Sequence, residues 1–166
     1  ALAGAPLHVE ATGGTVGARS ACRKGDQVAR FHAESIYAGA AVVIEAKREH
    51  RFTVAKALEE LEIGRSNRSA DAGVFVMARS HAGEGFPTFA RYGNDVLVVW
   101  DESDEGTDPY LQAALFLALG LATRQRRGAD QGNLEALADV EQRIERELKR
   151  HEKMRSLSSS IQQKSE

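Results

Sequence analysis

The chain has 166 residues, a formal net charge of −2 and 42% hydrophobic residues, which suits one domain with a buried core. Its single cysteine, Cys22, excludes an internal disulfide framework and favours a reducing, cytoplasmic compartment. The start of the sequence lacks a basic leader with an apolar run, and the longest apolar block, residues 111–122, is too short to span a bilayer. We therefore expect no membrane association, and contact with nucleic acid only through a local basic patch.

The first part of the chain predicts two neighbouring strands. Residues 1–24 are rich in Gly, Ala and small polar residues, so we expect the least regular structure there. Residues 26–36 alternate well enough for a strand, and residues 40–47 form an apolar run that suits a strand buried on both faces. Ala38-Gly39 supplies the turn, which predicts a hairpin or meander.

The middle of the chain predicts a helix followed by two further strands. Thr53 is suited to cap an amphipathic helix over 54–63, with Gly64 as its stop. Residues 72–79 and 95–100 read as strands separated by a Gly- and Pro-containing loop. The order strand, strand, helix, strand, strand predicts an α/β domain.

Two helices are predicted in the last third of the chain. Asp108 and Pro109 suit an N-cap and first helical position for a helix that runs to about Arg126. A second helix begins near Asn133, and its narrow apolar stripe predicts a helix that projects or pairs with itself. A self-pairing helix would make the protein a homodimer. The stripe consists of Leu134, Leu137, Val140, Ile144 and Leu148.

The buried strand over 40–47 ends by presenting Glu45 and Lys47, which lie two residues apart and therefore point to the same face. The same spacing occurs at Glu147 and Lys149, where the charged helical context indicates a solvated surface pair. At the end of a buried strand, however, two opposite charges need a partner or a task. A strand-end ion pair that contributes little to stability is one interpretation, and a catalytic site is the other.

A metal-dependent phosphodiesterase would give these charges a task. Magnesium takes one or two carboxylates with water and substrate phosphate, so a second acid is needed beside Glu45. Asp26 is the candidate, because it opens the neighbouring strand. Asp26 and Glu45 would hold the metal, the Ala46 carbonyl would add a ligand, and Lys47 would orient water or stabilise phosphate charge. Alternatively, Asp26 is a turn residue, a position that Asp favours.

The segments "GDQV" and "VVIEAK" resemble the motif of the PD-(D/E)xK nuclease superfamily, carried here by Asp26, Glu45 and Lys47. The longer pattern "RKGD…AAVVIEAKREHRFT…SADAGVFVMAR…YGNDVLVVWD" is similar to a branch of uncharacterised bacterial coiled-coil proteins related to RmuC, the DNA-recombination-limiting protein. This resemblance implies a restriction-endonuclease-like mixed central sheet flanked by helices, with a C-terminal helical extension. It also implies Mg²⁺ or Mn²⁺ as cofactor and DNA as partner. The implied organisation is an irregular segment over 1–24, a nuclease-like α/β core over 25–128 and a long helix over 129–166.

Several other charged residues have two interpretations each. A cluster at the exit of the strand would form a phosphate-binding rim or a solvated loop; it consists of Arg48, His50 and Arg51. Arg65 and Arg68 are phosphate contacts or surface residues, and neither they nor Glu62 is assigned a catalytic role. His32 and His81 have no partner at metal-ligand spacing, so we expect both to be structural or exposed.

Two classes of function remain open. The first is a magnesium-dependent deoxyribonuclease that uses the site described above. The second is a catalytically inactive DNA-binding or scaffold module that retains the fold, which the near-neutral charge favours because a DNA clamp usually carries a stronger basic surface.

Overall fold

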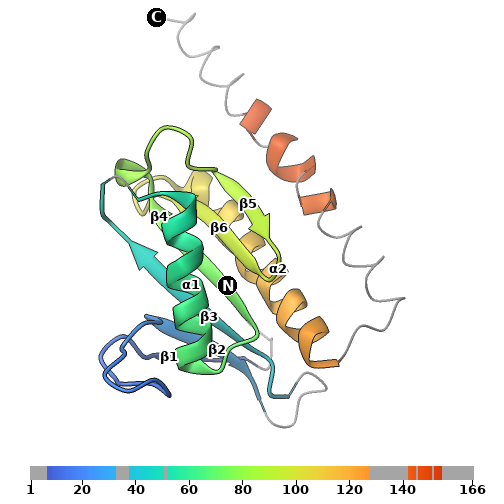
Figure 1. Cartoon of the computed structure of the whole chain (residues 1–166). Helices are drawn as coiled ribbons and strands as arrows, with labels where there is room; N and C mark the ends of the chain where they lie inside the picture. The colour runs from blue at the N-terminus through green and yellow to red at the C-terminus, as the bar shows by residue number, and fades with distance from the viewer. Residues whose placement is uncertain are drawn as a thin grey trace, which may run out of the picture. The chain divides into compact units, whose positions relative to one another are not determined.

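The computed structural model describes residues 7–32, 38–50, 52–127, 142–144, 146–150 and 152–154. The chain divides into two units, residues 1–130 and residues 131–166. The first unit is built on a six-stranded mixed β-sheet (Figure 1). Its strands are β1 (Leu7–Ala11), β2 (Gln27–Phe31), β3 (Ala41–Lys47), β4 (Ala72–Ala78), β5 (Phe89–Tyr92) and β6 (Asp95–Trp100).

The strand order is β1-β2-β3-β4-β6-β5. β2 and β3 pair antiparallel, as the sequence predicts, and β1 adds a third antiparallel strand beside β2. β4 and β6 run parallel to β3, and β5 returns antiparallel to β6. Lys47 at the end of β3 pairs with Met77, and Ala78 at the end of β4 pairs with Trp100. The carboxyl ends of three parallel strands therefore meet at one edge, where open α/β sheets commonly bind ligands.

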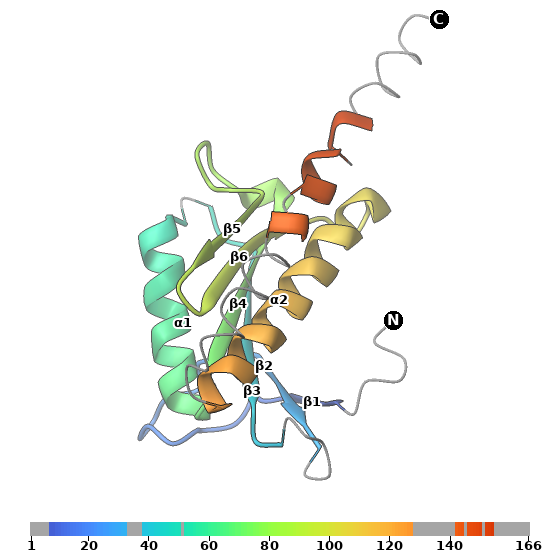
Figure 2. The same cartoon turned by 90° about the vertical axis from the view of Figure 1, so that its right-hand side faces the viewer.

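One long helix covers each face of the sheet. Helix α1 (Val54–Arg68) connects β3 to β4, and helix α2 (Asp108–Arg127) follows β6. Figure 2 shows the two helices on opposite sides of the strands. The predicted cap of α1 is confirmed, because the Thr53 hydroxyl accepts the Lys56 N–H at 3.2 Å. The unit is thus a three-layer α/β structure, in agreement with the predicted class.

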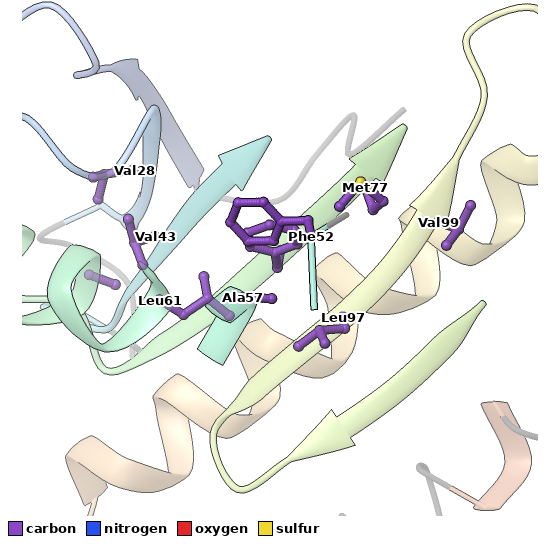
Figure 3. Packing of buried hydrophobic residues seen from close by; sticks show 10 residues of the cluster. Val28, Val43, Phe52, Ala57, Leu61, Met77, Leu97 and Val99 are labelled. Carbon is purple, nitrogen blue, oxygen red and sulfur yellow. The ribbon is translucent and has the colours of Figure 1, made fainter. Parts of the chain in front are cut away.

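A hydrophobic cluster lies between α1 and the sheet (Figure 3). Side chains alternate along each strand, so every second residue of the central strands faces α1 and the residues between them face α2. The buried members of the α1 cluster are Val28, Ala41, Val43, Phe52, Ala57, Leu61, Phe75, Met77, Leu97 and Val99. Val43 belongs to this cluster, which places Glu45, two residues on, on the α1 face as well.

Three local features differ from the sequence-based expectation. Gly64 does not stop α1; it is buried inside the helix and packs against Val43, where a Cβ would come 3.5 Å from Val43 Cγ2, an ordinary van der Waals distance. The helix ends instead at Arg68, and Ser69 caps it in a left-handed conformation with φ of 52°. The segment expected to be least regular contributes β1, and the predicted loop before β6 contains β5 and the short 3-10 helix Arg79–His81.

The second unit is helical over 142–144, 146–150 and 152–154. The predicted start near Asn133 and the residues Leu134, Leu137 and Val140 of the stripe lie outside the described residues. Glu147 is exposed, with 73% of its side-chain surface accessible, and lies 3.9 Å from Arg150. The tail copy of Glu-x-Lys is therefore a solvated surface feature, as predicted. Within the described part of the chain, no helix has the length and apolarity to cross a membrane.

Candidate functional site

The two motif segments of the sequence lie directly against each other. Gly25 donates its N–H to Glu45 Oε2 at 2.8 Å, and Ala46 donates its N–H to Asp26 Oδ2 at 2.9 Å. The Asp26 N–H in turn bonds the Ile44 carbonyl at 3.0 Å. Each carboxylate is thus fixed by the backbone of the other segment, where β2 begins and β3 ends.

Glu45 and Lys47 form an ion pair at the end of β3. Glu45 is buried, with 2% of its surface exposed, and its Oε1 accepts a hydrogen bond from Lys47 Nζ at 3.1 Å. The Lys47 side chain is itself 17% exposed. The pair is therefore much more buried than a surface salt bridge, and removing the lysine would leave the Glu45 charge buried without its ion-pair partner.

Three acidic groups act on Lys47. Burial lowers the pKa of Lys47, but the hydrogen bond to Glu45 and the negative charges of Glu45, Glu60 and Asp26 outweigh it and raise the pKa above its ordinary value. Lys47 therefore stays protonated and supplies a fixed positive charge at this edge of the sheet.

Glu60 and Lys24 belong to the same cluster, although the sequence analysis assigned neither of them. Glu60 lies on α1, and its Oε2 is 3.8 Å from Lys47 Nζ and in ion-pair contact with Lys24. A signal for Glu60 was present in the sequence: it follows the buried Ala57 by three residues and therefore lies on the sheet-facing side of the helix. The polar residues of this helix that the sequence singled out, Glu62, Arg65 and Arg68, lie further along α1 than Glu60.

Asp26 and Glu45 are the two carboxylates that could serve as ligands of a metal ion. One oxygen of each accepts a backbone N–H group, which orients both carboxylates, and the second oxygens are Asp26 Oδ1 and Glu45 Oε1. Among the residues that the structure describes, no group of three His, Cys, Asp or Glu side chains is arranged to hold a metal. Two carboxylates suffice for magnesium when water and substrate phosphate complete the shell. Glu45 Oε1, however, is already bonded by Lys47.

A cavity of about 610 Å³ opens beside this cluster, on the α2 side of the sheet. Asp26 and Lys47 line it, together with Arg48. Arg48 pairs with Glu102, and both side chains are largely exposed. The His50 ring lies 4.4 Å from the His81 ring, which is also at the cavity wall, whereas Arg51 lies outside the described residues.

Arg68 anchors the N-terminal loop of the sheet unit. It is 7% exposed, and its guanidinium donates to the carbonyls of Thr12, Thr15, Arg23 and Lys24 at 2.6 to 3.2 Å. These bonds fix the loop that carries Gly25 and Asp26 to the site. The guanidinium is occupied by the protein's own carbonyls, so its direct role in the structure is to position the motif.

Arg65 pairs with Asp95 at the opposite end of the parallel strands. Its Nε lies 3.0 Å from Asp95 Oδ1, and its Nη2 donates to Oδ2 at 3.1 Å. Burial raises the pKa of Asp95 to about 6, although the Arg65 charge opposes the rise. Gly73 makes room for this pair, because a Cβ there would lie 2.7 Å from Asp95 Oδ1. Arg65 thus has a partner in the protein, away from the Glu45–Lys47 pair.

Comparisons of this chain with protein-family models, curated proteins and solved structures gave no match.

Proposed function

We propose that the protein is a magnesium-dependent deoxyribonuclease, with a restriction-endonuclease-like sheet and a PD-(D/E)xK-type site formed by Asp26, Glu45 and Lys47. The observation that carries the proposal is the reciprocal bonding of the two motif segments, in which Gly25 holds Glu45 and Ala46 holds Asp26. Two acids and one lysine on adjacent strands are the side chains that this type of hydrolysis uses.

Each residue has a separate part in the proposed reaction. Asp26 and Glu45, with the Ala46 carbonyl, would hold Mg²⁺ or Mn²⁺, which when bound acidifies water and offsets phosphate charge. Lys47, kept cationic by its acidic neighbours, stabilises the negative charge that develops on the phosphate. A water molecule gives one proton to solvent as its oxygen bonds to phosphorus, one ester bond breaks, and the leaving oxygen takes a proton from solvent.

DNA would approach along the exposed side of this edge of the sheet. Arg48 is 65% exposed and His50 is exposed, so both side chains are accessible to backbone phosphates. Arg48 would exchange its partner Glu102 for a phosphate, which costs little because an exposed pair contributes little stability. We retain Arg51, Arg65 and Arg68 only as the weaker candidates for phosphate contact, since Arg65 and Arg68 bond to the protein itself.

A second candidate function is a DNA-binding or scaffold module without catalysis. It is favoured by the placement of the acids: Glu45 lies on the α1 face and is bonded by Lys47, whereas Asp26 lines the cavity on the α2 side. In this function the Glu45–Lys47–Glu60 cluster only stabilises the end of β3 against α1.

The test is cleavage of single- and double-stranded DNA across a titration of Mg²⁺ and Mn²⁺. Asp26→Asn is the principal variant, because the amide oxygen can still accept the Ala46 N–H while the charge is lost. Its matched control is Asp71→Asn, since Asp71 also accepts a backbone N–H, from Ala41 at 3.0 Å, beyond the site. Lys47→Ala has a control in Lys149→Ala, which removes the lysine of the solvated copy.

We expect metal-dependent cleavage by the wild type and by both controls, with loss in Asp26→Asn and Lys47→Ala. Circular dichroism must show all four variants folded at the assay temperature. Equal cleavage by Asp26→Asn and the wild type would refute the assigned site. No cleavage by a folded wild type with either metal would favour the scaffold.

A further inference from the structure

The cavity beside the candidate site has aliphatic and aromatic side chains in its walls, whereas a phosphate-binding surface consists of basic and polar groups. It lies at the carboxyl ends of β3, β4 and β6 and under the first turns of α2, and its volume is about 610 Å³. Pockets of this size hold a single small molecule or one nucleotide unit. Six of its lining residues are aliphatic: Ile44, Ala46, Val76, Ala78, Leu111 and Leu115.

An aromatic ring, that of Trp100, forms part of the wall. Its indole N–H donates to Asp108 Oδ1 at 2.8 Å, which fixes the ring at the junction of β6 and α2. The residue is partly exposed, so one part of the ring is accessible from the cavity. A ring held in this way is a preformed stacking surface, because no side-chain freedom has to be lost when a planar group binds.

Polar residues line the cavity on two sides. Asp26, Gln27, Lys47 and Arg48 belong to the side of the candidate site, and Arg79, Ser80, His81, Asp101 and Glu102 follow β4 and β6. Lys47 and Arg48 supply positive charge on the first side, where Asp26 is the proposed metal ligand. A ligand that spans the cavity therefore needs an anionic group at one end and a planar, weakly polar group at the other. A nucleotide has both, since its phosphate would lie at Lys47 and its base against Trp100.

We propose that this cavity binds one unpaired base of single-stranded DNA, stacked on Trp100, next to the phosphate at Lys47. The inference deepens the proposed nuclease function and names its substrate as single-stranded or unpaired DNA. A paired base is not available to the cavity, because its faces are covered by neighbouring base pairs and its edge by its partner. The net charge of −2 agrees, since recognition by stacking needs fewer phosphate contacts than binding a duplex.

Trp100 is the only tryptophan of the chain, so its fluorescence reports on this cavity alone. The experiment titrates the full chain in EDTA, where no metal-dependent cleavage occurs, with a short thymidine oligonucleotide. Parallel titrations use a blunt duplex of the same length and an abasic oligonucleotide with the same number of phosphates. We expect quenching by the thymidine oligonucleotide, and little response to the other two.

Variants separate stacking from charge. Trp100→Leu should weaken binding of a labelled thymidine oligonucleotide by about tenfold, as loss of one stacked base predicts. Ala78→Leu narrows the cavity and should weaken binding while the ring remains. Tyr92→Leu is the matched control, because it removes an exposed aromatic ring from β5 and should bind as the wild type does.

The outcomes distinguish this inference from the nuclease function. Quenching by single strands without cleavage in Mg²⁺ or Mn²⁺ would support the base-binding cavity and refute the nuclease. Cleavage that depends on Asp26, with equal use of duplex and single strands and no response of Trp100, would refute the cavity and support the nuclease. Equal affinity for the abasic and the thymidine oligonucleotide would also overturn the inference.

Discussion

Removal of the Lys47 ammonium tests the ion pair and the metal site together. In Lys47→Ala, Glu45 stays buried and keeps only the Gly25 N–H as a hydrogen-bond donor. The same change frees Glu45 Oε1, which is one of the two ligand atoms proposed for magnesium. The variant should therefore be less stable than the wild type without metal and should gain more stability when magnesium is added.

The size of the loss follows from the burial of the pair. Removing one partner of a buried pair costs about 3–5 kcal/mol of unfolding free energy. In Lys47→Ala the cost should be about 2–3 kcal/mol, because Glu45 keeps its hydrogen bond from Gly25 and the Lys47 side chain is partly exposed in the wild type. For a chain of this length such a loss lowers the midpoint of thermal unfolding by about 6–10 °C. Magnesium at ten times its dissociation constant restores about 1.4 kcal/mol by binding only the folded state.

The assay is denaturant unfolding with and without magnesium, at constant ionic strength. Lys149→Ala is the control for loss of a lysine and should keep the wild-type midpoint in both conditions. The double variant Glu45→Gln/Lys47→Ala should be more stable than Lys47→Ala without metal, because the unpaired charge is gone, and should show no gain from magnesium. A Lys47→Ala protein as stable as the wild type, or an equal magnesium effect in the double variant, would refute the reasoning.

Three further predictions concern Asp95, Gly73 and Arg68, which lie outside the Glu45–Lys47 pair. Asp95 holds its proton more tightly in the folded state, with a pKa of about 6 against an ordinary value of 3.8. The stability that the protonated form of Asp95 contributes is therefore complete below about pH 4, and about 3 kcal/mol of it is lost as the pH rises to about 6. Denaturant unfolding of Asp95→Asn should show no such loss across this pH range. A wild type and a variant whose unfolding free energies change in parallel with pH would contradict the prediction. Gly73→Ala places a Cβ 2.7 Å from Asp95 Oδ1 and should cost about 2 kcal/mol of unfolding free energy, whereas a neutral effect would show that the pair shifts freely. In Arg68→Lys the ammonium cannot bond the carbonyls of the loop over 12–24 as the planar guanidinium does. Hydrogen exchange of the Thr12 and Gly13 amides should therefore accelerate, and unchanged protection of these amides would count against the anchoring role of Arg68.

The sequence allowed the central elements to be predicted because their signals are local. The apolar run of β3 and the Thr53 cap of α1 each depend on neighbouring residues, and both are present. The four-residue strand β5 gave no such signal, because it forms only by pairing with β6. Gly64 looked like a helix stop, but it lies inside α1 and packs against Val43, a residue 21 positions earlier in the chain, which neighbouring residues do not reveal.

The site was predictable in part for the same reason. Glu45 and Lys47 are two residues apart on one strand, so their common direction follows from strand geometry. Arg68 was assigned as a surface residue or phosphate contact, yet its carbonyl partners lie 44 to 56 residues away in a segment that carried no strong pattern. No property of the arginine itself distinguishes these two roles.

Glu45 and Glu147 show what the spacing Glu-x-Lys can and cannot establish. Both are followed by a lysine two residues on, but the Glu45 side chain is 3% exposed and bonded to that lysine, while Glu147 is 73% exposed and lies near Arg150 instead. On a strand the spacing places two side chains on one face, whereas on a helix residues two apart point in different directions. The proposed chemistry therefore depends on β3, the strand that ends at Lys47. A substitution that preserves both charges but weakens this strand, such as Val43→Gly, should abolish activity at the site just as the loss of either charge would.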